Sequence, residues 1–231
     1  MTSHRLAPTR PSTPIVALVA LLAFAAAASA QLTTNDWAPT DNGFWTNGPN
    51  WTLDPDVPDT NTDVAQFTNV YGANFTVTLD ANLTINGIIY DDTDAVGNDA
   101  VLILARPGSE VLSFDGTDPF VESRSSTGGG DGIRFNLPVD VGAAGLTKIG
   151  FGVANLTSNL SGSGTVTVSQ GALEVRGDNV GFTGEFVVNG GVLDIRSGVN
   201  NSLGTNAAGT TINGTGQLRF RDMSNRIYTE S

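Results

Sequence analysis

The sequence predicts an all-β protein built as a parallel β-helix (a β-solenoid) with an N-terminal β-rich capping region. A strand-turn-strand unit repeats at a fixed spacing of twenty residues, and helical periodicity is nearly absent after residue 30. Gly accounts for 28 of the 231 residues, and short alternating runs are separated by Gly, Asn, Asp and Pro. These features are typical of short strands joined by tight turns.

The repeat is clearest between residues 164–176 and 184–196, which match in apolar and charged positions, and a third copy follows at residues 212–220. Residues two apart on a strand share a face, so one unit cannot bury its apolar face alone, whereas stacked units bury a continuous column. In-register stacking predicts two interior ladders, one of Leu173, Leu193 and Leu218, the other of Val175, Ile195 and Phe220.

The outward positions of the repeat carry acids and arginines. We expect Glu174 to pair diagonally with Arg196, and Arg176 with Asp194, as exposed pairs that fix the register. Glycines in the turns are expected where φ is positive. Residues 176–178 spell the adhesion tripeptide Arg-Gly-Asp, but the repeat already explains Arg176.

An antiparallel sandwich or barrel is the alternative architecture. The Asn-Gly dipeptides at residues 86–87, 189–190 and 213–214 are typical of two-residue hairpin turns. The solenoid is favoured because the copies match at a fixed period in both apolar and charged positions.

The first thirty residues have the pattern of a secretory signal peptide. Arg5 and Arg10 give a positive start, residues 15–28 form an apolar run that is short for a membrane span, and residues 28–30 (Ala-Ser-Ala) form a cleavage site. We expect a mature chain that begins at Gln31 and has no later membrane span, with an uncleaved N-terminal anchor as the alternative.

Composition divides the chain further. Residues 1–30 are the predicted signal peptide and residues 31–124 an N-terminal β-rich region. Residues 125–132 are predicted to form a Gly/Ser-rich linker, and residues 133–231 the solenoid repeats.

Charge and missing residue types exclude several functions. All 23 acidic residues but only nine of the 11 basic ones follow Ala30, which gives the mature chain a net charge of −14 and disfavours nucleic acid and anionic lipid as partners. The chain has no Cys, and its one His, His4, lies in the signal peptide. Ser-His-Asp and Cys-His catalysis and the usual zinc and copper sites are thereby excluded, while carboxylate chemistry such as glycoside hydrolysis remains open.

Several stretches resemble the autotransporter-associated β-strand repeat. Residues 146–152 (Leu-Thr-Lys-Ile-Gly-Phe-Gly) and 188–195 (Val-Asn-Gly-Gly-Val-Leu-Asp-Ile) are similar to the opening and closing strands of that repeat. Residues 45–67 are similar to the pattern Trp…Asn-Trp…Pro…Asp-x-Ala-x-Phe that opens such proteins, and residues 76–88 resemble the Thr- and Ile-rich stretch that follows. The resemblance covers most of the mature chain. It implies a parallel β-helix-like passenger region, which a bacterium exports and displays or releases, and it supplies no catalytic residues.

The sequence departs from this family in two respects. Residues 152–156 match the expected strand poorly, and the sequence stops at Ser231 without the translocating β-barrel or short C-terminal anchor usual in the family. The resemblance therefore does not supply an anchoring route.

Trp45 and Trp51 are the candidate ligand-binding residues, because neighbouring indole rings can stack against a sugar. Their alternative role, which we favour, is to plug the end of the solenoid, where a cap is needed. Two groups of aspartates could offer oxygen ligands to calcium: Asp54, Asp56, Asp59 and Asp63, and Asp91, Asp92, Asp94 and Asp99. Neither group fits a calcium-binding spacing, so we expect solvated loops, and we expect no metal or cofactor.

We therefore expect a non-catalytic exported protein of the bacterial cell surface or the extracellular space, with the periplasm as an alternative, and with a structural, display or adhesive role. A carbohydrate-binding module that uses Trp45 and Trp51 is the alternative, and a polysaccharide-active β-helix enzyme is a further one. The expected partners are extracellular glycans, other surface proteins, or further copies that associate through the solenoid ends.

Overall fold

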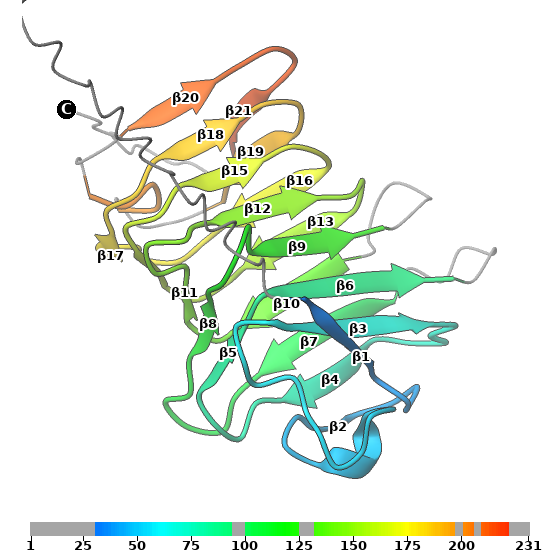
Figure 1. The fold of residues 1–231 in the computed structure, drawn as a ribbon. Coiled ribbons are helices and arrows are strands. Elements are labelled where there is room, and N and C mark those ends of the chain that lie inside the picture. Colours follow the sequence, from blue (N-terminus) through cyan, green and yellow to red (C-terminus); the bar gives the residue numbers. More distant parts are fainter. Residues whose placement is uncertain (1–30, 94–99, 125–131, 197–200, 206–208, 222–231) are drawn as a thin grey trace, which may run out of the picture.

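The strands wind around one interior and stack into three parallel sheets (Figure 1). The structure is a computed structural model that describes residues 31–93, 100–124, 132–196, 201–205 and 209–221. The predicted signal peptide and residues 125–131 of the predicted linker lie outside the described residues, and Gly132 begins a strand.

Sheet 1 contains eight strands in the order β1 (Thr33–Asp36), β3 (Asp63–Asn69), β6 (Gly87–Asp92), β9 (Phe120–Ser123), β12 (Leu146–Ile149), β15 (Val166–Val168), β18 (Phe186–Val188) and β20 (Thr210–Ile212). Sheet 2 contains eight strands in the order β2 (Gly43–Phe44), β4 (Phe75–Thr78), β7 (Val101–Ala105), β10 (Gly132–Asn136), β13 (Val153–Leu156), β16 (Ala172–Val175), β19 (Val192–Ile195) and β21 (Gln217–Phe220). Sheet 3 contains five strands in the order β17 (Gly181–Phe182), β14 (Leu160–Gly162), β11 (Val139–Asp140), β8 (Leu112–Phe114) and β5 (Leu83–Ile85). A short 3₁₀ helix, η1 (Gly48–Asn50), lies between β2 and β3.

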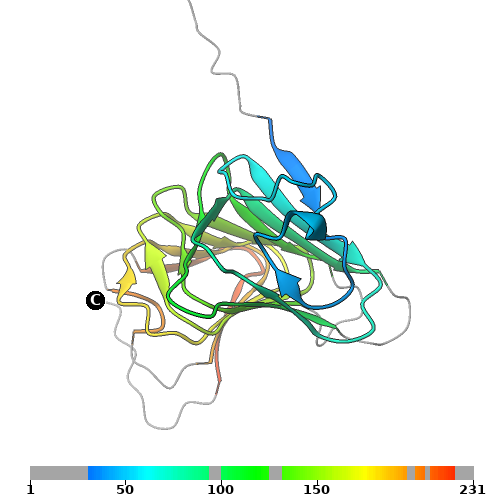
Figure 2. The ribbon, with the colours of Figure 1, turned by 90° about the horizontal axis from the view of Figure 1, so that it is seen from below.

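The chain advances through the sheets in a repeating order, so each strand pairs in parallel with a strand of the turn before it. Leu146 pairs with Val166, and Val166 pairs with Phe186, so two successive turns are twenty residues long. Seen from below, the successive turns lie behind one another around a shared interior (Figure 2). The predicted parallel β-helix and its period are confirmed.

The antiparallel alternative is wrong. Every ladder between named strands in the described part of the chain is parallel. Residues 189–190 and 213–214 lie where the chain passes from a sheet 1 strand to the sheet 2 strand that follows, and Gly87 begins β6. Asn-Gly here marks a corner or the start of a strand, because the chain turns onto the next sheet instead of folding back beside itself.

Alternating side chains fill the interior. In the two predicted ladders, Leu173 pairs with Leu193 and Leu193 with Leu218, while Val175 pairs with Ile195 and Ile195 with Phe220. The first two members of each ladder are buried, whereas Leu218 is partly buried and Phe220 is 44% exposed. The third copy is less covered because β21 is the last described strand of sheet 2.

Residues 152–156, which match the family's strand poorly, still contribute a regular strand. β13 pairs in parallel with β10 on one side and with β16 on the other. Its side chains alternate, with Ala154 and Leu156 buried in the interior. The weak sequence match did not prevent the strand, because two neighbouring turns fix its register.

Close stacking of the turns explains why glycines recur at the corners. A Cβ atom on Gly184 would lie 2.1 Å from the carbonyl oxygen of Gly164, and one on Gly164 would lie 2.2 Å from the nitrogen of Gly145. Gly171 has the expected positive φ of 63°, but its repeat partner Gly191 does not belong to the positive-φ residues. Gly191 is needed instead because a Cβ atom there would lie 2.8 Å from the carbonyl oxygen of Gly171.

Replacing Gly184 with Ala should therefore lower the free energy of unfolding by about 1–3 kcal/mol, the usual cost of overpacking. The measurement is chemical denaturation followed by circular dichroism. Gly72→Ala is the matched control, because nothing lies within 4 Å of the added Cβ atom, and it should leave stability unchanged or slightly raised. Equal effects of the two changes would show that the turns do not stack as closely as described.

Candidate functional site

Three tryptophans close the N-terminal end of the solenoid. Trp37, Trp45 and Trp51 are 2%, 0% and 2% exposed, and they pack against the buried Phe67 of β3. The ring centroids of Trp45 and Trp51 lie 5.0 Å apart, and those of Trp37 and Trp51 lie 5.1 Å apart in an edge-to-face arrangement. Such large rings bury the apolar end of the first described turn, which no other described turn covers on that side.

The polar edges of two of these rings are also satisfied inside the protein. The indole Nε1 of Trp45 donates to the carbonyl oxygen of Pro58 at 2.8 Å, and that of Trp51 donates to the carbonyl oxygen of Trp45 at 2.7 Å. Trp45 and Trp51 thus lie in the cap, and in this structure neither ring presents an open face to a sugar.

Trp45→Ala should lower the free energy of unfolding by about 3–5 kcal/mol, because it removes a fully buried ring and leaves a cavity. The neighbouring Phe44 is 56% exposed, so Phe44→Ala should change stability by no more than about 0.5 kcal/mol. Thermal and chemical unfolding of both variants checks the pair. A small effect of Trp45→Ala would show that the ring is not part of the core.

The aspartates of residues 54–63 are used for turns. The carboxylate of Asp63 accepts hydrogen bonds from the backbone nitrogens of Asp59 and Thr60 and from the Thr60 hydroxyl. Within residues 31–93, 100–124, 132–196, 201–205 and 209–221, no three or more His, Cys, Asp or Glu side chains gather as metal ligands would. Asp92 accepts a hydrogen bond from the Tyr71 nitrogen, and Asp94 and Asp99 lie outside the described residues.

The lysine of the Leu-Thr-Lys motif points into the interior. Lys148 lies on β12 between Val121 of the turn before and Val168 of the turn after, and it is 1% exposed. The sequence pattern gave this residue no role. Its alternation with Leu146, which is buried on the same strand, is the signal that places Lys148 on the inner face.

The amine of Lys148 reaches backbone carbonyl oxygens at a corner. Its Nζ lies 2.6 Å from the oxygen of Ile149, 2.8 Å from that of Gly150 and 3.4 Å from that of Gln170. A neutral amine has two N–H donors, which match the two short contacts. Lys148 therefore satisfies its own buried amine by donating to backbone carbonyl groups at this corner.

Burial lowers the pKa of Lys148 to about 7, and the nearby Glu122 carboxylate opposes this effect. The unfolded chain carries Lys148 at its ordinary pKa of 10.5. Between these values the unfolded state binds more protons than the folded state, so stability rises with pH. The contribution is complete above the unfolded pKa, is lost progressively as the pH falls from that value, and is fully lost below the folded pKa.

The free energy of unfolding should therefore increase by a few kcal/mol between pH 7 and pH 9.5, at about 1.4 kcal/mol for each pH unit within the window. Lys148 is the only lysine and the chain has no Cys. Between pH 7 and pH 9.5 we therefore expect only Lys148 and the α-amino group to titrate. Urea unfolding at several pH values measures the slope. Lys148→Met should make it nearly flat, and an unchanged slope in this variant would contradict the assignment to Lys148.

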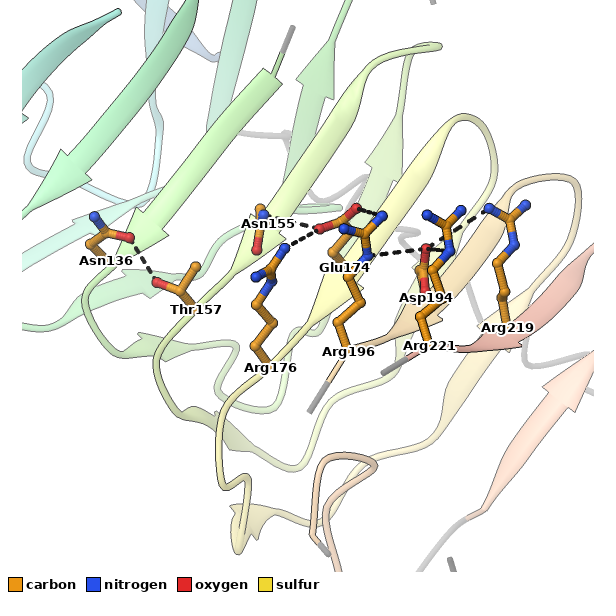
Figure 3. A network of polar contacts seen from close by, with 9 residues as sticks. All are labelled: Asn136, Asn155, Thr157, Glu174, Arg176, Asp194, Arg196, Arg219 and Arg221. Atoms are coloured by element: carbon orange, nitrogen blue, oxygen red, sulfur yellow. Dashed lines mark hydrogen bonds and ion pairs between the residues drawn. The ribbon is translucent and has the colours of Figure 1, made fainter. Parts of the chain in front are cut away.

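Charged side chains form a continuous network on the outer side of sheet 2 (Figure 3). Asn155, Glu174, Asp194 and Arg219 occupy one column across four neighbouring strands. Asn155 donates a hydrogen bond to the Oε2 of Glu174 at 3.0 Å. This network contains the charged repeat positions identified in the sequence.

The diagonal pair between Arg196 and Glu174 is confirmed, with Nη2 and Oε1 2.9 Å apart. The other expected pair is wrong: Arg176 contacts Glu174 of its own strand at 3.0 Å instead of Asp194. Asp194 is held by the arginines of its own and the following strand, with its Oδ2 3.5 Å from Arg196 Nε, 3.0 Å from Arg221 Nε and 3.9 Å from Arg219 Nη1.

The two carboxylates are not exposed, contrary to expectation. The side chains of Glu174 and Asp194 are 10% and 2% exposed because the arginines lie over them. Removing the partners of a buried charge costs more than losing a surface pair. Each carboxylate in this network therefore depends on its arginines, because losing them would leave a buried charge without a partner.

Sequence reasoning missed Arg219 and Arg221 as members of this network. Both flank Phe220, which the third copy of the repeat already aligns with Ile195. The alignment thus carried the signal: Arg219 takes the place of Asp194, and Arg221 takes the place of Arg196.

The Arg-Gly-Asp tripeptide is held by internal contacts. Arg176 pairs with Glu174, and Asp178 accepts a hydrogen bond from Asn201 at 2.9 Å. A Cβ atom on Gly177 would lie 2.1 Å from the carbonyl oxygen of Ser158, so the glycine is needed for stacking. All three residues therefore have structural roles.

Comparison with known proteins gives one distant similarity that bears on function. The chain is 29% identical over 187 residues to the adhesin BmaC autotransporter of Brucella suis biovar 1 (strain 1330). The aligned region covers 73% of this chain but only 5% of that adhesin. No family model and no solved structure matches the chain. None of the described residues forms a helix that could cross a membrane.

Proposed function

We propose that this chain is an exported, non-catalytic β-helix that acts in adhesion at a bacterial cell surface. The observation that carries the proposal is the in-register parallel stack, which extends each sheet face over successive turns. The distant similarity to an autotransporter adhesin supports an adhesive role for such a stack. The signal-peptide pattern of residues 1–30 supports export.

A binding role fits the chemistry better than catalysis. The mature chain lacks His and Cys, so its acid–base groups are mainly carboxylates. Of the eight glutamates and aspartates on the described strands, two, Glu174 and Asp194, are covered by arginines. A glycosidase needs two carboxylates that face a substrate across a gap, and these two serve the fold instead.

The proposal predicts that beads coated with the purified chain adhere to at least one biological surface, such as cultured epithelial cells or extracellular matrix. The control is a bead coated with an unrelated protein of similar negative charge, which removes charge as the explanation. Retention under flow is the measurement. Retention no greater than the control on every surface tested would refute adhesion by this chain.

A substrate panel separates adhesion from enzymatic action on the same samples. We expect no new reducing ends when the chain is incubated with neutral and acidic polysaccharides. Steady release of product, lost on heating, would replace the adhesive proposal with a polysaccharide-active enzyme.

A further inference from the structure

One face of this acidic protein carries an excess of positive charge. On the outer side and at the ends of four sheet 2 strands, β10, β16, β19 and β21, five arginines accompany two carboxylates: Arg134, Arg176, Arg196, Arg219 and Arg221 against Glu174 and Asp194. The whole sequence has a net charge of −12, so the cationic face is opposite in sign to the rest of the molecule. The nearby Asp178 lies past the turn at Gly177 and is bound by Asn201.

Three of these arginines form a column parallel to the solenoid axis. The backbone nitrogens of Arg176, Arg196 and Arg221 donate to residues of the preceding strand in the same register. Neighbouring members are therefore one strand spacing apart, about 4.8 Å. Figure 3 shows their guanidinium groups in a row, with Arg219 beside them.

Like charges on adjacent strands normally destabilise a sheet. Here the buried carboxylates of Glu174 and Asp194 lie between the arginines and hold the row in place. The acids thus compensate part of the charge and leave the outer edges of the guanidinium groups toward solvent.

The arginines retain capacity to bind a ligand. The side chains of Arg176, Arg219 and Arg221 are 39%, 41% and 41% exposed. Arg219 approaches Asp194 only to 3.9 Å, which is too long for a hydrogen bond. Each guanidinium has five N–H donors, and the contacts described use a minority of them.

We propose that this arginine face binds a linear acidic polysaccharide, with its carboxylate groups along the arginine column. The inference deepens the proposed adhesive function, on which it rests, by naming the class of ligand. Planar guanidinium groups match carboxylates in paired hydrogen bonds. A repeat of one strand spacing suits a polymer that offers an anionic group on each sugar.

The surrounding charge makes this binding selective for one face. The remaining acidic surface repels a polyanion, so the polymer is expected to contact sheet 2 alone. At moderate salt, the attraction between exposed charges is screened beyond about 8–10 Å. Binding therefore depends on close contact and weakens as salt is added.

The test measures binding of the purified full chain to polygalacturonate, with dextran as the neutral polymer, by isothermal titration calorimetry at low and high salt. We expect binding to polygalacturonate alone, weakened by salt. The double variant Arg176→Gln/Arg219→Gln should lower affinity about tenfold or more, which corresponds to losing one or two charge-assisted hydrogen bonds.

The matched control is Arg106→Gln/Arg124→Gln, which removes the same charge outside the arginine column, since Arg106 follows β7, three strands from β16, and Arg124 follows β9 of sheet 1. Arg106 binds the Glu110 carbonyl and Arg124 pairs with Glu122 of sheet 1. This variant should bind within about twofold of the unaltered chain.

The test variant should stay folded because both carboxylates keep partners. Glu174 retains Arg196 and Asn155, and Asp194 retains Arg196 and Arg221. Circular dichroism and thermal unfolding verify this. If the double variant does not fold, Arg134→Gln, which breaks none of the contacts described, replaces it and should weaken binding about threefold.

Other outcomes overturn the inference. Equal loss of affinity in the control pair, equal binding of duplex DNA, or self-association that the test variant abolishes would each assign the face to a different partner or to none. Beads that adhere equally with the test variant, and that soluble polygalacturonate does not displace, would refute this site and leave the adhesive function standing. Polygalacturonate binding without any bead adhesion would refute the adhesive function and leave the site standing.

Discussion

The parallel pairing of each turn with the turn before it is the constraint on which the structure depends. Because the strands pair in register, a residue on one turn meets its counterpart on the next at one strand spacing. Leu173 meets Leu193, and Glu174 meets Asp194. Every position along the repeat is therefore selected for how it stacks on a copy of itself, which explains the shared pattern of apolar, charged and glycine positions.

Stacking also creates the polar problems that particular residues solve. Two acidic positions on adjacent strands repel, and arginines from both sides of each acid cover and neutralise them. At a corner next to β12 the buried Lys148 donates to two backbone carbonyl groups, which satisfies an amine that no solvent reaches. At the N-terminal end of the described strands, the tryptophan cap covers the interior where a further turn would otherwise stack. Each feature answers a need that repetition by itself produces.

These solutions bear on function because they decide which groups face the solvent. The tryptophan rings, which could otherwise stack on a sugar, are buried in the cap. In the Arg-Gly-Asp tripeptide, Arg176 pairs with Glu174 and Asp178 accepts a hydrogen bond from Asn201. The arginines, which outnumber the acids they cover, keep donors on the outer face. A protein whose net charge is −12 thus presents one cationic surface, and that surface carries the regular spacing of the fold.

The sequence alone determined the all-β class, the period of twenty and the membership of the interior ladders, since alternation and repeat spacing are local properties of the chain. It also indicated that tryptophans would cap an end. Only the tertiary structure decided that Asp194 is 2% exposed, because the arginines that cover it belong to its own and the next turn and their reach depends on side-chain conformation. It likewise decided that Arg176 turns to Glu174 and that Lys148 is buried, because both choices depend on which partners the neighbouring turns bring within hydrogen-bonding distance.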